Sequence, residues 1–267
     1  MIINLSLIRR LIQFTLSCFI VLSISIFEGY GQQIADTSDI KQKDSMDIQN
    51  NMMIPSAFYT QMGVPINVGN FDLKMAALPT INDGKTKTQF NFQVATGLSK
   101  TVTFYLDGKA LFYNPMIEES LQFPVIDAMF QFSVLKSENG LCGFSPFIEF
   151  EFPWWEAHTR SIYTLVGYAA TLSNSHFAFD QVLHYNPLKD LAEGSASLVV
   201  KVSKRIFLVS EVSGVTQTST RPVFNLLGGV KVKFNKDFLL GLAYQIPLTD
   251  NRDYSSQYVF QPDIIFQ

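Results

Sequence analysis

Hydrophobic and polar residues alternate along most of the chain, from about residue 69 to the C-terminal end. The alternation is clearest over residues 238–248, where Leu239 alone is out of place and Gln245 belongs to the polar side. The apolar side there carries Phe238, Leu240, Leu242, Tyr244, Ile246 and Leu248. Because successive side chains of a β-strand point to opposite faces, this pattern predicts strands with one apolar and one polar face.

The same pattern recurs often enough to predict roughly twelve strands, most of them about ten to twelve residues long. The predicted ranges are 69–79, 86–96, 101–113, 123–135, 141–152, 160–172, 176–186, 195–204, 206–216, 223–234, 238–248 and 256–266. Strands of soluble proteins average about half that length, whereas a tilted strand that crosses a bilayer needs about ten residues. The lengths therefore favour membrane-spanning strands.

The connections between the predicted strands alternate between tight turns and longer loops. The tight turns fall at 97–100, 137–140, 172–175, 203–205 and 235–237. The longer loops fall at 114–122, 153–159, 187–194, 215–221 and 249–255, and only the link at 81–85 is a short member of that set. Short turns on one rim and long loops on the other are expected of an up-and-down barrel in an outer membrane, with both termini on the periplasmic side.

Alternation by itself does not distinguish a soluble sandwich, which buries its apolar face, from a membrane barrel, which presents that face to lipid. Strand length, loop asymmetry and an export signal favour the barrel. The sequence thus predicts an all-β fold, a transmembrane up-and-down antiparallel β-barrel of about twelve strands over residues 67–267.

Residues 1–31 have the three parts of a secretory signal peptide. Basic Arg9 and Arg10 precede an apolar stretch over residues 11–27, and small residues lead to a cleavage site before Gln32. A transmembrane anchor is the alternative, for which the apolar stretch is slightly short. Residues 32–66 begin with a polar, aspartate-containing stretch, and they are predicted to form a short flexible periplasmic leader.

Composition supports the membrane interpretation. Hydrophobic residues make up 47% of the chain and charged residues only 16%, which is few for a water-exposed surface. The formal net charge of -3 gives no electrostatic support for a nucleic-acid partner. The expected partners are outer-membrane lipid, the barrel-assembly machinery and a small-molecule solute, and the expected location is the cell outer membrane.

In the predicted register no charged residue lies on the lipid face, where one near the midplane would cost about 2–4 kcal/mol. The lumen face carries Asp72, Lys74, Asp107, Lys109, Asp127, Glu149, Glu151, Asp180, Lys201, Glu211, Lys231 and Lys233. These charges are expected either to line a narrow polar channel or to fill the barrel as a salt-bridged network that conducts nothing. Tyr113, Trp154, Trp155, Tyr185 and Tyr258 lie near strand ends and suit an aromatic girdle, although an ordinary hydrophobic loop contact explains the Trp pair as well.

The candidate catalytic groups do not form a recognisable constellation. His176 follows serines instead of preceding one, as a barrel phospholipase would need, and His184 lies too far along its strand from Asp180 for a direct hydrogen bond. His158 is expected in a loop. The same-face pair Glu149 and Glu151 could form an acid–base or cation site, but a lumen charge network explains it better. After signal cleavage Cys142 is the one cysteine, so an internal disulfide is not expected, and no Cys/His spacing resembles a metal site. No catalytic residue, metal site or cofactor is predicted.

Two stretches resemble the outer-membrane family named for the meta-pathway of phenol degradation. Residues 234–266, FNKDFLLGLAYQIPLTDNRDYSSQYVFQPDIIF, resemble that family's closing hairpin with its LGLGxQxPLT strand. Residues 207–214, FLVSEVSG, resemble a mid-barrel strand, and the likeness over 69–194 is looser. Gln267 departs from the pattern, because many barrels end on an aromatic residue and here Phe266 is penultimate. The resemblance implies a transporter or channel for small, hydrophobic or aromatic solutes, and it implies no catalytic residue.

The function expected from the sequence is passive passage of small solutes through an outer-membrane barrel, not catalysis. The first alternative is a non-conducting structural or adhesion barrel that acts through its outer loops. A barrel enzyme and a secreted soluble β protein follow as further alternatives.

Overall fold

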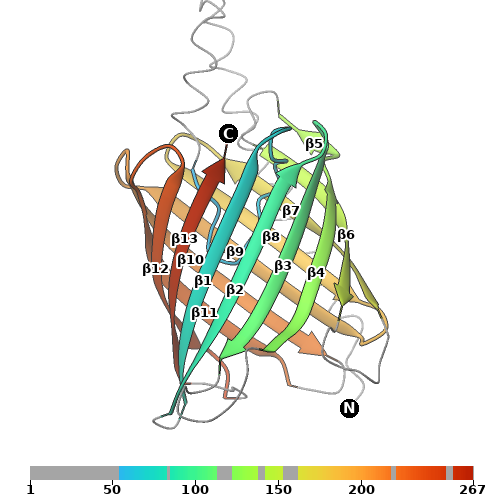
Figure 1. Cartoon of the computed structure of the whole chain (residues 1–267), viewed down its shortest axis with the longest axis vertical. Coiled ribbons are helices and arrows are strands. Elements are labelled where there is room, and N and C mark those ends of the chain that lie inside the picture. The colour runs from blue at the N-terminus through green and yellow to red at the C-terminus, as the bar shows by residue number, and fades with distance from the viewer. Residues whose placement is uncertain are drawn as a thin grey trace, which may run out of the picture. The chain divides into compact units, whose positions relative to one another are not determined.

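The structure is a computed structural model that describes residues 54–82, 85–112, 122–137, 142–152, 162–217, 221–250 and 255–266. Within these residues it is all β (Figure 1). The strands are β1 (Phe71–Asn82), β2 (Lys85–Gly97), β3 (Val102–Phe112), β4 (Gln122–Phe132), β5 (Leu135–Lys136), β6 (Cys142–Phe152), β7 (Tyr163–Ser173), β8 (Phe177–Asn186), β9 (Leu191–Lys201), β10 (Ile206–Gln217), β11 (Val223–Lys233), β12 (Phe238–Pro247) and β13 (Ser256–Phe266). In this part of the chain no helix is long and apolar enough to cross a membrane.

The strands form one closed antiparallel sheet in which each long strand pairs with its sequence neighbours. Strand β5 has only two residues and follows β4 after a short break, so the described residues contain twelve long strands. β1 pairs with β13, and β4 pairs with β6 from Ile126↔Phe152 to Gln131↔Phe147, which closes the ring. A closed barrel leaves no open strand edge, as a membrane-spanning sheet requires. The predicted all-β antiparallel barrel of about twelve strands is confirmed.

The two faces of the barrel wall differ as the alternation predicts. Large apolar side chains such as Phe90, Leu208, Leu242 and Phe260 are exposed on the outer face. The inner face carries buried charged side chains, among them Asp180, Glu211 and Lys231. Among the strand residues whose side chains are described, no charged one lies on the outer face, because each has the inward parity.

Most predicted strands agree with the structure to within a few residues, and the largest difference concerns β9. The sequence predicted a strand over 195–204 after a long loop over 187–194, whereas β9 spans Leu191–Lys201 and the turn before it covers only 187–190. Asp190 ends this turn with a positive φ of 47°. Ala192, Gly194 and Ala196 weaken the apolar pattern at the start of β9, and this hid four strand residues from the sequence argument.

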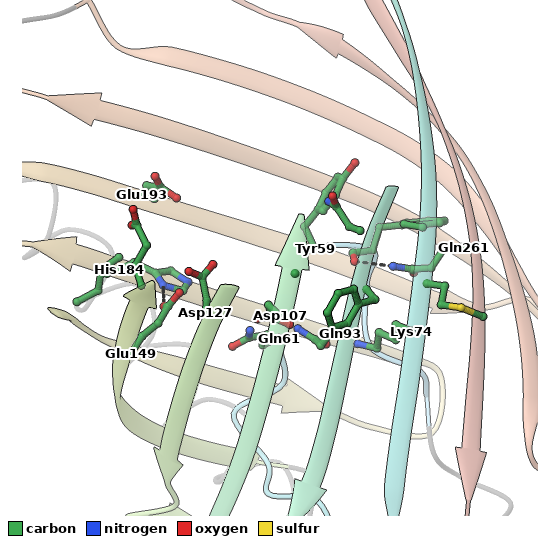
Figure 2. A pocket seen from close by; sticks show the side chains of 18 of the residues that line it. Tyr59, Gln61, Lys74, Gln93, Asp107, Asp127, Glu149, His184, Glu193 and Gln261 are labelled. Carbon is green, nitrogen blue, oxygen red and sulfur yellow. Dashed lines mark hydrogen bonds and ion pairs between the residues drawn. The ribbon is translucent and has the colours of Figure 1, made fainter. Parts of the chain in front are cut away.

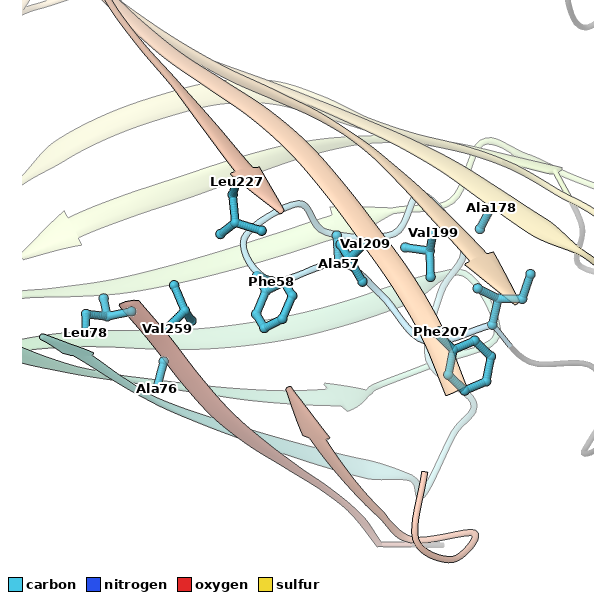
Figure 3. Close-up of a cluster of buried hydrophobic side chains, with 11 residues drawn as sticks. Ala57, Phe58, Ala76, Leu78, Ala178, Val199, Phe207, Val209, Leu227 and Val259 are labelled. Carbon is cyan, nitrogen blue, oxygen red and sulfur yellow. The ribbon is translucent and has the colours of Figure 1, made fainter. Parts of the chain in front are cut away.

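Residues 54–66 do not lie outside the barrel; they run through its lumen. Ile54, Ala57 and Phe58 pack against inward-facing apolar side chains of the wall (Figure 3). These wall residues are Ala76, Leu78, Ala178, Val199, Phe207, Val209, Leu227 and Val259. A second cluster combines Ala95, Tyr105, Met129, Phe147, Ala169 and Val182 with Ile66. We call residues 54–66 the lumen segment.

The lumen segment corrects one prediction. The sequence assigned residues 32–66 to a flexible periplasmic leader, and for 54–66 that position is wrong because this part is buried inside the barrel. Apolar side chains that face a lumen need cover from water, and the segment provides it. The rest of the predicted leader and the predicted signal peptide at 1–31 lie outside the described residues.

Candidate functional site in the barrel lumen

The lumen segment is held on one side by Glu211 of β10. The Thr60 hydroxyl donates to Glu211 Oε1 at 2.6 Å, and the Tyr59 backbone N–H donates to Glu211 Oε2 at 3.1 Å. Ser195 of β9 adds a third contact, with its Oγ 2.9 Å from Thr60 Oγ1. Glu211 is only 1% exposed, so a buried carboxylate uses both oxygens to bind the segment.

A second part of the wall, on β6 and β7, binds the segment at Gly63. The Gly63 N–H donates to Thr171 Oγ1 at 2.7 Å, and the Thr171 hydroxyl donates in turn to Asp180 Oδ1 at 2.6 Å. The Ser145 hydroxyl donates to the Gly63 carbonyl at 2.7 Å. Two flanking bonds come from Gln131 Nε2 to the Met62 carbonyl and from the Ile66 N–H to the hydroxyl of Thr103. The segment thus crosses the lumen with its backbone bonded to both parts of the wall, as buried backbone groups require.

Two lysines reach the segment from β1 and β11. Lys231 Nζ donates to Asp263 Oδ2 at 2.8 Å and to the Ala57 carbonyl at 3.2 Å, and its side chain is fully buried. Lys74 Nζ donates to Ser56 Oγ at 2.7 Å. The ammonium group of Lys231 is thus shared between a carboxylate of the wall and a backbone carbonyl of the segment. Because this ion pair is buried, it holds the segment at Ala57.

Glycines let the segment approach the wall closely. A Cβ placed on Gly143 of β6 would lie 2.6 Å from the Gly63 carbonyl oxygen, which is closer than real Cβ atoms come. On the other side, Cβ atoms on Gly229 and Gly241 would lie 2.8 and 2.6 Å from the Phe58 ring. The missing side chains create a slot for Phe58 and a backbone contact for Gly63.

Beside the segment the lumen keeps a cavity of about 420 Å³ (Figure 2). Phe58, Tyr59 and Gln61 of the segment form part of its lining. The charged or polar lining residues from the wall are Lys74, Asn91, Gln93, Asp107, Asp127, Glu149, Glu151, His184, Lys189, Glu193 and Gln261. The volume is in the range of small-molecule sites, but the wall is far more acidic and polar than the usual apolar pocket.

Glu149 and Glu151 of the cavity contact cationic or ionisable side chains. Glu149 of β6 and His184 of β8 lie on either side of β7, and His184 Nδ1 is 2.8 Å from Glu149 Oε2. The β7 residue paired with His184 is Gly167, which has no side chain between them. Lys189 Nζ donates to Glu151 Oε1 at 2.8 Å and lies 3.9 Å from the centre of the Tyr163 ring. These pairs hold the two glutamate side chains of β6 in place at the cavity.

The predicted lumen residues separate into three groups. Five of them line the cavity: Lys74, Asp107, Asp127, Glu149 and Glu151. Asp180, Glu211 and Lys231 bind the lumen segment directly or through Thr171. Asp72, Lys201 and Lys233 are partly buried near strand ends, and the side chain of Lys109 lies outside the described ones.

The predicted aromatic girdle is described only in part. Tyr185 and Tyr258 are exposed near the ends of β8 and β13, and Tyr185 donates to Asp190 Oδ1 at 3.1 Å. Tyr258 stacks against Tyr244 with ring centroids 5.1 Å apart. Tyr113, Trp154 and Trp155 lie outside the described residues.

The histidines that could have supported catalysis lie in two separate places. His176 is exposed in the turn before β8 and contacts the adjacent Ser175, while His184 faces the cavity. His158 lies outside the described residues. Among the described residues no three His, Cys, Asp or Glu side chains converge as a metal site would require.

Sequence reasoning missed four contributors to the site: Tyr59, Gln61, Glu193 and Asp263. The first two belong to the lumen segment, which shows no alternation. Glu193 lies in the stretch predicted as a loop, and Asp263 is not among the charges predicted to line the lumen. The available signal was the set of apolar residues on the polar face, such as Phe207, which demand a partner inside the barrel.

Comparison with known proteins gives matches among solved structures. No protein-family model and no curated protein matches the chain. An outer-membrane channel of Pseudomonas putida F1, COG4313, matches with a TM-score of 0.55 at 9% identity, covering 80% of this chain and 100% of that one. The KdgM porin in complex with oligogalacturonate gives 0.51 at 8% identity, and the NanC porin gives 0.52 at 6%. Both cover 74% of this chain and 99% of the porin.

These identities are too low to carry a function, so the likeness establishes the fold alone. The class that this fold defines is the closed antiparallel β-barrel of twelve long strands, an architecture similar to that of these channels. The chain has the fold of such channels together with a lumen segment and an acidic cavity.

Proposed function

We propose that this protein is an outer-membrane channel for small polar solutes, with a lumen narrowed by its own residues 54–66. The observation that carries the proposal is the closed twelve-stranded wall, apolar and uncharged outside and charged inside around a cavity of about 420 Å³. An uncharged outer belt suits lipid, and a hydrated, charged lumen suits a solute path. The porin-like fold of the structural matches supports the same conclusion.

The finer family assignment belongs to this proposal as well. The likeness of residues 207–214 and 234–266 to the phenol-degradation family supports membership of that family and thereby a transport role. The hydrophobic or aromatic cargo that this family implies is less well supported, because the cavity lining is rich in carboxylates and amides. We therefore place a polar solute in the path.

Export completes the proposal. Cleavage after residue 31 would release the signal peptide. Short turns on one rim and longer loops on the other suit a barrel whose two termini lie on the periplasmic side. N-terminal sequencing of protein extracted from outer membranes should then begin at Gln32, and the folded protein should migrate faster than the boiled one on gels.

A second candidate, a non-conducting barrel, is favoured by the lumen segment itself. The segment is hydrogen-bonded to Glu211, Thr171, Ser145 and Gln131, which lie on four different strands of the wall. It therefore occupies space in the lumen that a solute would need. The two candidates differ in whether ions flow through the reconstituted protein and whether the segment has to move.

A reversible cross-link separates them. Thr60 Oγ1 lies 2.9 Å from Ser195 Oγ, so cysteines at these positions are within reach of a disulfide. In a Cys142→Ser background, Thr60→Cys with Ser195→Cys should conduct in planar bilayers when reduced and lose most of that conductance when oxidised. The matched control is Cys142→Ser alone, which should conduct equally in both states. Reduced protein with no conductance above that of empty bilayers would establish the non-conducting barrel.

A further inference from the structure

The acidic cavity has a row of carboxylates that the barrel fold alone does not explain. Asp107 of β3 pairs directly with Asp127 of β4, and Asp127 pairs directly with Glu151 of β6. Directly opposite side chains on one face of a sheet lie close together, and like charges in such pairs are destabilising. Three carboxylates therefore lie side by side on the wall, over two strand spacings or about 10 Å.

The balance of charge around the cavity is negative. Among the described lining side chains, five carboxylates (Asp107, Asp127, Glu149, Glu151 and Glu193) face two lysines and one histidine. Glu193 makes no hydrogen bond or ion pair in the described part of the chain, although it lines the cavity beside His184.

A second and independent feature is Gln61 of the lumen segment. Its side chain is 92% buried, since only 8% of it is exposed, and it lines the same cavity (Figure 2). Its Oε1 has no hydrogen-bond partner among the described residues. A buried amide carbonyl without a donor is costly, so a donor that enters the cavity would be favoured there.

The lining also indicates what kind of cation fits. No three carboxylates converge among the described residues, so the wall suits a cation with several separated donors better than a single metal ion. The Phe58 and Tyr59 rings border the cavity and can receive an ammonium group or an alkyl chain. The volume of about 420 Å³ accommodates a small organic molecule.

We infer that the cavity binds a linear aliphatic polyamine, with ammonium groups on the carboxylates of β3, β4, β6 and β9 and on the carbonyl oxygen of Gln61. This rests on the proposed function, because it names the solute class of the same lumen. Binding needs no conduction, so the two proposals can fail separately.

The test measures binding of spermidine to the full-length detergent-solubilised protein by calorimetry. 1,8-Octanediol, which has no charge, and magnesium chloride are the comparison probes. Spermidine should bind measurably. The diol should not bind, since hydrogen bonds between charged groups carry a large part of the affinity. Magnesium should bind at least about tenfold more weakly than spermidine, because no three carboxylates converge among the described residues. No spermidine binding, or magnesium binding of equal strength, would overturn the inference.

Variants locate the site. Glu193→Gln should weaken spermidine binding by about fivefold or more, and Glu193→Lys should abolish it, because each removes an accepting charge. Asp237→Asn is the matched control: it makes the same change in an exposed turn outside the cavity and should leave binding unchanged. Equal weakening by Glu193→Gln and Asp237→Asn would contradict a site in the cavity. Asp127→Asn provides a second variant if a Glu193 variant does not fold.

Conductance measured on the same preparations separates the two proposals. Spermidine binding without any conductance would refute the channel and leave the polyamine site standing. Conductance with no spermidine binding would do the reverse.

Discussion

At the scale of single residues, Glu211 is the side chain on which the lumen segment depends most. It accepts hydrogen bonds from Thr60 and from the Tyr59 backbone while almost completely buried. In Glu211→Gln the amide nitrogen faces a donor, so one of these bonds is lost. A bond to a buried charged group is worth about 1.5–3 kcal/mol, and the segment should therefore leave the lumen more often.

Chymotrypsin can report this change, because Phe58 and Tyr59 are cleavage sites that the folded barrel protects. Cleavage at these residues should be about tenfold or more faster in Glu211→Gln than in the wild type, provided that opening is fast relative to cleavage. Glu193→Gln removes a lumen carboxylate that makes no hydrogen bond to the segment among the described residues, and this variant should be cleaved at the wild-type rate. Equal rates in both variants would mean that Glu211 does not hold the segment.

At the scale of elements, the contact between the lumen segment and β6 allows no added atom. A Cβ on Gly143 would approach the Gly63 carbonyl oxygen to 2.6 Å, and backbone cannot yield as a flexible side chain can. Gly143→Ala should destabilise the barrel by about 1–3 kcal/mol through overpacking, or displace the segment. The temperature at which the fast-migrating folded form disappears on gels should fall.

Gly228→Ala is the control for this substitution, since it makes the same chemical change on another strand, β11, where no atom lies within 4 Å of the added Cβ. It should leave the transition unchanged or raise it slightly, as the loss of glycine restricts the unfolded chain. A fall of the same size in both variants would trace the effect to the strand itself instead of to the segment.

The elements also show what the sequence could predict. Ten or more residues of alternating character fix both the strand and the face of each side chain, so Leu242 and Glu211 were placed on opposite faces correctly. The lumen segment has no such period, and its partners are far away along the chain: Thr60 and Glu211 are separated by 151 positions. Local pattern carries no information on such a contact. The sequence signal of the lumen segment was indirect: apolar side chains such as Leu78, Val209 and Leu227 occur on the otherwise polar inner face, where the segment covers them.

The candidate site follows the same division. The wall carboxylates Asp107, Asp127 and Glu151 could be assigned to the lumen because strand parity alone determines their side. That they lie directly opposite one another depends on the register between β3, β4 and β6, which the two connections between these strands help to set. Gln61 could not be assigned, because its position depends on the fold of the lumen segment.

At the scale of the whole molecule, the apolar belt distinguishes a membrane barrel from a soluble one. Leu242 lies near the middle of β12 and is 51% exposed, while Leu248 lies just beyond its end and is 54% exposed. In a bilayer the first would lie near the midplane and the second near the interface. Arginine should then cost about 2–4 kcal/mol at the midplane and about 0–1 kcal/mol near the interface.

Urea unfolding in lipid vesicles measures these costs, and Leu242→Arg should lose more stability than Leu248→Arg by about 2 kcal/mol. In water the two leucines are equally exposed, so a soluble β protein would tolerate both arginines alike. Equal transitions for the two variants in vesicles would therefore reject the membrane barrel. The difference should vanish when the protein is unfolded from short-chain detergent, which has no bilayer midplane. Such a result would show that the cost depends on depth in the bilayer, because the two leucines are equally exposed and lie along the same strand direction.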